Sequence, residues 1–317
     1  MRAIRITEFG GPEVLRLEEV PDPAPTEGFD LVEVTAAGVN YADTHQIENT
    51  YLSDTQLPMI PGSEVVGVTS DGRRVSSLVG TGGYAEKALA YPDLTFDLPD
   101  AVSDGQALAL MVQGLSAWHL LRTCSHLAPG ETVVVHAAAG GVGTLAIQLA
   151  KLWGAGRVIG VASSADKREL AASLGADVTV DGGAADLKAA LKDANGGAPV
   201  DIVLEMVGGP TFDASLAALA PFGRLVTFGM AGRTPPAPIE AGALLQRSRA
   251  VIGFWLVHCL GKPGMVKEPM AEMLGLVADG RLKPIVGATY PLGDARRAHE
   301  DLRARNSTGK LVLDPRS

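Results

Sequence analysis

The feature that most constrains the fold of this chain is a glycine-rich turn between a strand-like and a helix-like segment. Residues 132–137 form a short, largely apolar run, as expected of a parallel strand covered by helices on both faces. The next six residues, Ala138-Ala139-Gly140-Gly141-Val142-Gly143, match G-x-G-x-x-G with alanine in the first position, and residues 144–153 follow a helical period. In such a turn Gly140 lets the backbone approach a pyrophosphate, Gly143 lets the helix pack closely, and the helix N-terminus offers N–H groups to the anion. The turn therefore predicts a dinucleotide site.

The alternation of apolar runs and helical runs continues after this turn. We predict strands at residues 132–137, 157–162, 177–180, 201–206, 223–228 and 250–255. We predict helices between them at residues 144–153, 165–174, 184–194, 211–219 and 241–247. A lone glycine turn is weak support in a chain with 38 glycines, but this one lies at the first strand–helix crossover of the series. The pattern predicts a six-stranded, doubly wound α/β domain.

The segments on either side of this region differ from it. The first hundred residues contain short strand-like runs, including a hairpin whose Asp71-Gly72 turn joins residues 64–69 to 74–79. The tail lacks the βα alternation, and it is predicted to complete the first unit. We therefore expect a β-rich domain formed by residues 1–115 and 256–317, and a nucleotide-binding domain inserted at residues 116–255.

The charge balance and the hydropathy exclude several classes of partner. The chain has 27 Lys and Arg against 36 Asp and Glu, and its net charge of −9 repels nucleic acid and anionic membranes. No apolar run approaches the roughly 18 residues that indicate a membrane-spanning helix. Cys124 and Cys259 are too few for a disulfide framework and suit a reducing compartment. We expect a cytoplasmic protein with no nucleic-acid or membrane partner.

The end of the second predicted strand bears on which dinucleotide is bound. An NAD site places a carboxylate there to hold the ribose hydroxyls, whereas this chain has Ser163 and Ser164, followed by Lys167 and Arg168. The serines can donate to a 2′-phosphate, and either basic residue can neutralise it. A serine here can also simply cap the following helix. We predict NADPH as the cofactor.

Several motifs, taken in chain order, resemble those of one known family. They are Gly38-Val39-Asn40-Tyr41-Ala42-Asp43-Thr44, Pro61-Gly62-Ser63-Glu64, Gly82-Gly83-Tyr84-Ala85-Glu86, His136-Ala137-Ala138-Ala139-Gly140-Gly141-Val142-Gly143, Ala162-Ser163-Ser164, Ala278-Asp279-Gly280-Arg281-Leu282, Ala298-His299-Glu300 and Gly309-Lys310-Leu311-Val312. Over nearly its whole length the chain resembles the zinc-free, zeta-crystallin-like quinone oxidoreductases of the medium-chain dehydrogenase/reductase superfamily. The resemblance implies a GroES-like catalytic domain, an inserted Rossmann domain, NADPH as hydride donor, a quinone or enone substrate and a homodimer.

The resemblance also assigns roles to individual residues. Asn40 is expected near the nicotinamide, and Tyr51 at the quinone pocket. The residues expected to contact the cofactor are Asn40, Ser116, Gly140, Gly141, Val142, Ser163, Ser164, Lys167, Phe228, Gly229, Met230, Phe254 and Trp255. The chain departs from the family at His45, where a tyrosine is usual, at Ile47, where an arginine is usual, and at Gly182, where a tyrosine often lies beside the adenosine phosphate.

The sequence offers no metal site. Zinc-dependent relatives have cysteine where Asn40 stands and histidine where Ser63 stands, so only Glu64 of that pattern is left. None of the six histidines forms a ligand-spaced pair. His136 is expected to be a hydrogen-bonded core histidine, and His299, on a polar helix, is expected to be solvated.

Without a Lewis acid, the acceptor must delocalise negative charge by itself, as quinones and conjugated carbonyls do. The protein then has to hold the reactants together, exclude water and supply hydrogen-bond donors. Tyr51 can donate a proton to the reduced oxygen, and His45 can relay one. Either residue can instead merely line the pocket.

Two other functions remain open. The spacing Asp43-x-x-x-Ile47-x-x-x-Tyr51 is similar to that of 2-enoyl thioester reductases, in which the tyrosine donates the proton. A protein that binds NADPH or single-stranded RNA without catalysis is the third possibility, although the charge argues against RNA. The last strand of the inserted domain, residues 250–255, would be an apolar sheet edge, and pairing with a second copy would cover it.

Overall fold

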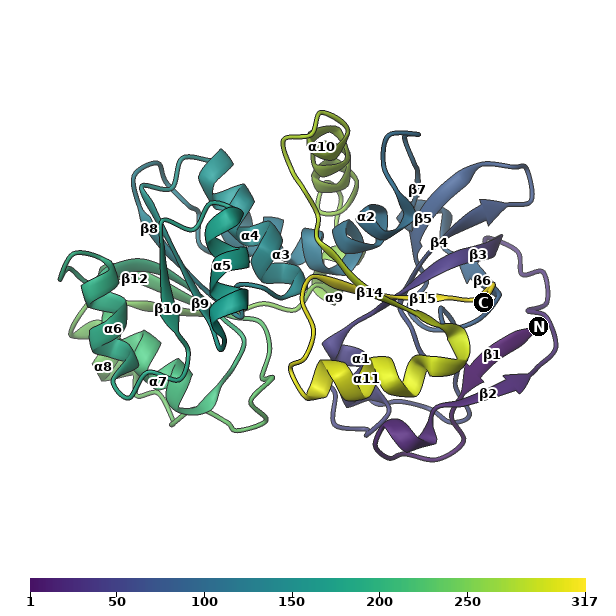
Figure 1. Ribbon diagram of the computed structural model, residues 1–317, viewed down its shortest axis with the longest axis horizontal. Coiled ribbons are helices and arrows are strands. Elements are labelled where there is room, and N and C mark those ends of the chain that lie inside the picture. The colour runs from purple at the N-terminus through teal and green to yellow at the C-terminus, as the bar shows by residue number, and fades with distance from the viewer. The chain divides into compact units, whose positions relative to one another are not determined.

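The computed structural model describes all of residues 1–317 and divides into two compact units (Figure 1). Unit 1 consists of Met1–Gln113 and Leu260–Ser317, and unit 2 consists of Gly114–Cys259. No helix is both long and apolar enough to span a bilayer.

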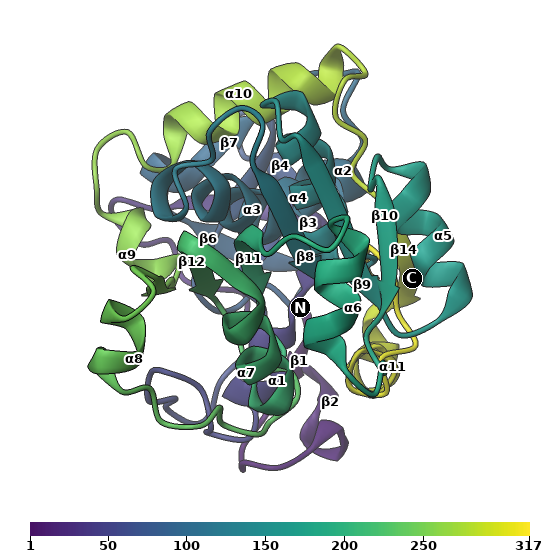
Figure 2. The ribbon, with the colours of Figure 1, turned by 90° about the vertical axis from the view of Figure 1, so that its left-hand side faces the viewer.

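Unit 2 is built on one parallel sheet of six strands in the order β10-β9-β8-β11-β12-β13. Its strands are β8 (Thr132–His136), β9 (Arg157–Ala162), β10 (Val178–Asp181), β11 (Val200–Glu205), β12 (Leu219–Thr227) and β13 (Ala250–Gly253). Figure 2 shows them side by side, from β12 through β11, β8 and β9 to β10. Along the chain, β9 and β10 are added on one side of β8, and β11, β12 and β13 are then added on its other side. The predicted doubly wound α/β sheet is confirmed.

Helices cover both faces of this sheet. The helices of unit 2 are α3 (Leu115–His119), α4 (Gly141–Leu152), α5 (Ala165–Ser173), α6 (Leu187–Ala194), α7 (Gly209–Ala218) and α8 (Ala241–Leu245), and α9 (Val257–Leu260) crosses into unit 1 along the chain. Helix α4 packs on β8 and β9, α5 on β9 and β10, α6 on β10, and α7 on β11 and β12, and α6 and α7 also pack on each other. Because right-handed crossovers change face when the strand order reverses, α6 and α7 lie on the opposite face from α4 and α5. Helices α4 and α7 begin at Gly141 and Gly209, which is three and two residues before the starts predicted from the sequence.

His136, the last residue of β8, is buried in the core of unit 2, as predicted. Its Nε2 atom lies 2.8 Å from the hydroxyl of Ser215 on α7. Burial lowers the pKa of His136 to about 4, so the ring is neutral at physiological pH.

Unit 1 is built on a seven-stranded sheet in the order β14-β15-β3-β4-β5-β7, with β6 also paired to β3. Its strands are β3 (Asp30–Val39), β4 (Glu64–Thr69), β5 (Arg74–Leu78), β6 (Lys87–Ala90), β7 (Thr95–Asp97), β14 (Val286–Pro291) and β15 (Lys310–Asp314). A separate hairpin pairs β1 (Arg2–Arg5) with β2 (Arg16–Glu19). The predicted hairpin between β4 and β5 is confirmed, and Gly72 in its turn has a φ of +86°.

The tail of the chain supplies two strands to this sheet. Strand β15 pairs in antiparallel fashion with β3, and β14 pairs in parallel with β15. The helices of unit 1 are α1 (Tyr41–Gln46), α2 (Asp104–Ala109), α10 (Lys267–Ala278) and α11 (Ala295–Arg303). One π-helical turn, Leu110–Gly114, crosses from unit 1 into unit 2 along the chain, and a second, Leu120–Cys124, belongs to unit 2.

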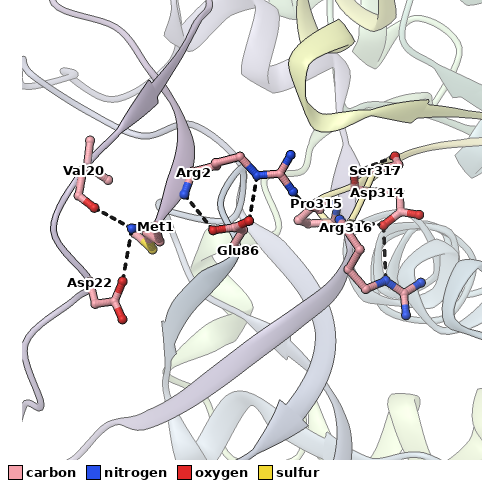
Figure 3. Close-up of polar contacts among 9 residues, drawn as sticks. All are labelled: Met1, Arg2, Val20, Asp22, Glu86, Asp314, Pro315, Arg316 and Ser317. Carbon is pink, nitrogen blue, oxygen red and sulfur yellow. Dashed lines mark hydrogen bonds and ion pairs between the residues drawn. The ribbon is translucent and has the colours of Figure 1, made fainter.

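Both chain ends are anchored in unit 1 (Figure 3). The terminal amino group donates to the carbonyl of Val20 at 2.7 Å and lies 3.2 Å from Asp22. Arg2 forms an ion pair with Glu86 at 2.7 Å and donates to the carbonyl of Pro315 at 2.6 Å. The side chain of Arg2 thus ties the first strand to the last few residues of the chain.

Candidate active site

The glycine-rich turn lies where the sequence predicted it, between β8 and α4. Gly140 is the N-cap of α4, and its N–H donates to the carbonyl of Ala137 at 2.8 Å. The helix begins at Gly141, so the first N–H groups of α4 have no partner within the helix. These groups and the helix dipole favour an anion at this end of α4, and Gly141 and Val142 are the residues that would present them.

Gly143 is required by packing rather than by backbone conformation. A Cβ atom at this position would overlap the carbonyl oxygen of Ala137 and lie 2.8 Å from the Cα of Ala138. Only glycine therefore allows α4 to start this close to the end of β8. This is the close strand–helix approach that a dinucleotide-binding turn needs.

At the end of β9 the structure places hydroxyls and one cation together. Ser163 and Ser164 are exposed, and the Ser164 hydroxyl also caps α5 by accepting from the N–H of Lys167 at 3.4 Å. The Arg168 guanidinium donates to the carbonyl of Ala162, the last residue of β9, at 3.3 Å, and lies 3.4 Å from the Asp181 carboxylate. The capping and the ligand-binding roles of the serines are compatible, because a hydroxyl that accepts from a backbone N–H still has a hydrogen to donate.

The remaining predicted cofactor residues of unit 2 follow other strands at the same edge of the sheet. Phe228, Gly229 and Met230 follow β12, and Phe254 and Trp255 follow β13. The N–H of Phe254 donates to the carbonyl of Thr227 at 2.9 Å, which holds the two segments together. The carboxyl ends of parallel strands are where ligands bind in open α/β sheets. Ser116 differs, because it lies on α3 and is buried, with 7% of its surface exposed.

In unit 1 the predicted catalytic residues lie on one short segment after β3. Asn40 is buried and is the N-cap of α1. His45 lies on α1, with its Nδ1 atom 3.0 Å from the Thr50 hydroxyl, and Tyr51 lies half-buried in the loop that follows. The spacing Asp43-x-x-x-Ile47 reflects packing, because both side chains are buried in unit 1. Of the three residues in the reductase-like spacing, Tyr51 is the one that is not buried.

The prediction that His299 is solvated is wrong. His299 is fully buried on the face of α11 that also carries Ala295 and Ala298, and its Nε2 atom lies 3.1 Å from the Tyr84 hydroxyl. That hydroxyl donates to the Asp43 carboxylate at 2.7 Å, so it accepts from Nε2–H of His299, and Nδ1 is left without a partner. Burial lowers the pKa of His299 to about 3.

Asp43 shares this buried cluster and supports the start of α1. Its Oδ2 atom accepts from the backbone N–H of Asn40 at 2.8 Å as well as from Tyr84. Burial raises its pKa to about 6, against the opposing effects of the Tyr84 and Asn40 hydrogen bonds and of the Lys310 charge. Asp43, Tyr84 and His299 thus fix the segment that carries the predicted catalytic residues, and composition alone did not reveal them.

The donor set around Glu64 does not fit a zinc ion. Asn40 and Ser63 offer neither thiolate nor imidazole, and both Glu64 oxygens are already hydrogen-bonded. Oε1 accepts from the ammonium of Lys310 and from Asn40 Nδ2, and Oε2 accepts from the N–H of Val112 at 2.8 Å. Throughout the chain, no group of three or more His, Cys, Asp or Glu side chains is placed to hold a metal ion.

Sequence reasoning also missed Glu205, a fully buried carboxylate at the end of β11. Its Oε1 atom accepts from the N–H groups of Val207 and Gly208 at 2.7 and 3.0 Å, while Oε2 has no partner. Burial raises the pKa of Glu205. The signal was available, because a charged residue that ends an apolar strand in such a sheet lies at the ligand-binding edge.

Two family descriptions match this chain. An alcohol dehydrogenase GroES-like domain matches residues 27–100, in unit 1, and a zinc-binding dehydrogenase domain matches residues 141–278.

Known proteins match it along nearly its whole length. A quinone oxidoreductase of Mus musculus is 34% identical over 334 residues, covering 99% of this chain and 97% of that protein. The structure of a mycobacterial protein complexed with NADPH has a TM-score of 0.92 and 38% identity, covering 99% of this chain and all of the other. The quinone oxidoreductase of Escherichia coli complexed with NADPH has the same TM-score and 34% identity, with 99% and 100% coverage.

Proposed function

Because this chain belongs to the quinone oxidoreductase, zeta-crystallin-like branch of the medium-chain dehydrogenase/reductase superfamily, we propose that it is an NADPH-dependent oxidoreductase that reduces quinones or related conjugated carbonyls. Relatives named quinone oxidoreductase, and similar structures complexed with NADPH, support both parts of this proposal. The bound cofactor would supply the hydride.

The observation that carries the proposal is the turn at the start of α4. Gly143 leaves no room for a Cβ atom, and the turn lies at β8, where the strand order of the sheet reverses. That position is where dinucleotides bind in doubly wound folds. We propose that Gly140, Gly141 and Val142 hold the pyrophosphate. We propose that Ser163 and Ser164, together with Lys167 or Arg168, hold the 2′-phosphate.

The segment after β3 would bind the acceptor and supply its proton. A quinone that takes up a hydride needs one proton to become a hydroquinone, and the hydroxyl of Tyr51 or the imidazole of His45 can supply it. Asn40 would contribute a hydrogen-bond donor near the nicotinamide. On the cofactor side, we propose that Ser116 and the segments at Phe228 and Phe254 support the nicotinamide half.

A second candidate, reduction of a 2-enoyl thioester, uses the same residues. In that reaction the hydride goes to the β-carbon and Tyr51 protonates the α-carbon. The half-buried position of Tyr51 is compatible with either substrate.

We propose that the enzyme works without zinc and as a homodimer in the cytoplasm. The occupied oxygens of Glu64 support zinc independence. Strand β13 is an edge strand, paired only with β12, and Phe222 and Leu245 near it are 76% and 81% exposed. Pairing of β13 with its copy would cover this edge. Both cysteines are free, which suits a reducing compartment.

The experiment that tests the function compares acceptors. NADPH oxidation is followed with 1,4-benzoquinone, 9,10-phenanthrenequinone and crotonyl-CoA, after measurement of NADPH binding by fluorescence. We expect binding, turnover with the quinones, and no loss of activity on dialysis against a chelator. Turnover with crotonyl-CoA alone would establish the second candidate, and binding without turnover would indicate a non-catalytic protein. A monomeric mass in sedimentation would contradict the dimer.

A further inference from the structure

Unit 1 buries an ion pair that the proposed chemistry does not use. Lys310, at the start of β15, and Glu64, at the start of β4, are both fully buried, and the ammonium of Lys310 contacts Glu64 Oε1 directly. The other two hydrogens of the ammonium reach the carbonyl of Val39 at 3.2 Å and Oδ1 of Asn40 at 3.0 Å. Every donor of this lysine therefore has an acceptor.

The pair packs against the backbone of β3 through Gly38. A Cβ atom at Gly38 would overlap Glu64 Oε1 and lie 2.7 Å from Cε of Lys310. The glycine thus makes room for two charged side chains inside the sheet. Replacing a buried ion pair by neutral groups is often neutral or stabilising, so stability alone gives no reason to keep it.

The chemistry of the pair determines the orientation of the Asn40 carboxamide. An ammonium can only donate, so the atom of Asn40 that faces Lys310 must be the oxygen. A carboxylate can only accept, so the atom that faces Glu64, at 2.8 Å, must be the nitrogen. Gln113 is compatible with this orientation, because its Nε2 atom donates to Asn40 Oδ1 at 3.2 Å.

The orientation limits what Asn40 can offer to a ligand. Its oxygen already accepts two hydrogen bonds, and one of its two amide hydrogens is used by Glu64. One N–H remains. We propose that the Lys310–Glu64 ion pair is a positioning device, which locks Asn40 as a hydrogen-bond donor toward the nicotinamide half of the cofactor or the oxygen of the acceptor.

This inference rests on the proposed function, because Asn40 acts on a ligand only if that site is used. It goes beyond it in assigning a role to Lys310 and Glu64, which would touch neither cofactor nor substrate. A neutral pair could not impose the same orientation, because a glutamine at position 64 can donate or accept. The fixed charges are what remove this ambiguity.

The test is a mutant cycle on the purified full-length protein. The Lys310→Met/Glu64→Gln double variant removes both charges and approximately preserves the volume of the two side chains. Lys310→Met alone would leave the buried carboxylate of Glu64 without its counter-charge. Asn40→Ala is made in the wild-type and in the double-variant background. For each protein, dissociation constants are measured for NADPH and for 2′,5′-ADP, which lacks the nicotinamide, and kcat and KM are measured with 1,4-benzoquinone.

We expect Asn40→Ala to lower kcat/KM or NADPH affinity about tenfold in the wild-type background, the value of about one hydrogen bond, and less than about twofold in the double-variant background. Affinity for 2′,5′-ADP should stay unchanged throughout, which shows that unit 2 is folded and functional. An equal effect of Asn40→Ala in both backgrounds, or wild-type kinetics in the double variant, would overturn the inference. Failure of the wild-type protein to bind NADPH would instead overturn the proposed function.

If the double variant does not fold, Gln113→Met provides the second route. It removes one of the two donors to Asn40 Oδ1 and leaves the ion pair intact. We expect a smaller loss of NADPH affinity, of about twofold to fivefold, with 2′,5′-ADP binding unaffected. Equal losses for both ligands, or no loss for NADPH, would contradict a positioning role.

Discussion

The Asp181→Asn substitution should strengthen binding of the cofactor's 2′-phosphate. Arg168 is the one guanidinium at the end of β9, and it is held there by the carbonyl of Ala162 and by the Asp181 carboxylate, 3.4 Å away. A 2′-phosphate at this strand end would compete with Asp181 for the same cation. Removing the carboxylate frees Arg168 and also removes a negative charge beside the phosphate.

The size of the gain follows from the exposure of the pair. The side chains of Arg168 and Asp181 are 25% and 54% exposed, so their ion pair is a surface pair of the kind that contributes about 0.2–1 kcal/mol. Releasing Arg168 from it should improve affinity for a 2′-phosphate by up to about fivefold. Arg168→Gln should weaken it by roughly tenfold or more, because a hydrogen bond to a charged group contributes about 1.5–3 kcal/mol.

The assay is a calorimetric or fluorescence titration with 2′,5′-ADP and with 5′-AMP, which lacks the 2′-phosphate. Asp166→Asn is the matched control, because Asp166 is an exposed carboxylate on the same helix, α5, two residues before Arg168. We expect Asp181→Asn to improve affinity for 2′,5′-ADP alone, and the Arg168→Gln/Asp181→Asn double variant to lose that improvement.

Two results would refute the reasoning. If Asp166→Asn and Asp181→Asn give equal gains, the effect is one of net charge and not of the contact with Arg168. If the double variant keeps the gain, Arg168 does not contact the phosphate, and Lys167 with the two serines is left as the binding set. Because surface charges are screened by salt, the gain should shrink as ionic strength rises.

Three further predictions concern single residues. Tyr51→Phe should lower quinone turnover at least about tenfold if its hydroxyl donates the proton, and unchanged turnover would leave it as a pocket wall. Because the pKa of His136 is lowered from 6.5 to about 4 on folding, its contribution to stability is complete above pH 6.5 and is lost as the pH falls toward 4. The drop in unfolding free energy between about pH 7 and pH 5, measured in urea, should therefore be about 2 kcal/mol smaller in His136→Gln than in wild type, whereas Ser215→Ala should keep the wild-type drop. Gly143→Ala should lower stability by about 1–3 kcal/mol and weaken NADPH binding, whereas Gly242→Ala, where no atom lies within 4 Å of the new Cβ, should do neither.

The elements of unit 2 were predictable because their signals are local. Each strand of the sheet is a short apolar run, and the turn at Gly140 and Gly143 is contained in the few residues that join β8 to α4. Boundaries were less accurate, since β13 ends at Gly253 whereas the apolar run continues to Trp255. That run leaves the sheet because β12, its one neighbour there, ends its pairing at Thr227.

The composition of α11 explains why His299 was predicted to be solvated although it is buried. Helix α11 carries several charged residues, among them Arg296 and Glu300, and its composition therefore indicates a solvated helix. Its buried face is narrow, formed by Ala295, Ala298 and His299, with spacings of three and four residues. Small side chains make a weak hydrophobic stripe, so the histidine was assigned to the wrong face. The periodicity of the alanines was the better guide.

The Lys310 cluster could not have been predicted, because it is assembled from four distant segments. A lysine at the start of a strand is ordinarily solvated, and nothing in Gly309-Lys310-Leu311-Val312 marks it as buried. Its partner Glu64 lies 246 residues away in the sequence, and the two meet only because β3 lies between β15 and β4 in the sheet, with Gly38 leaving room for both. The sequence alone shows that the zinc ligands are missing. That Lys310 neutralises the remaining carboxylate, Glu64, depends on the order of the strands in the sheet. For this reason the role of Asn40 has to be tested both in the wild-type protein and in the Lys310→Met/Glu64→Gln variant. A single substitution cannot separate the loss of the Asn40 hydrogen bond to a ligand from the loss of its contact with Lys310.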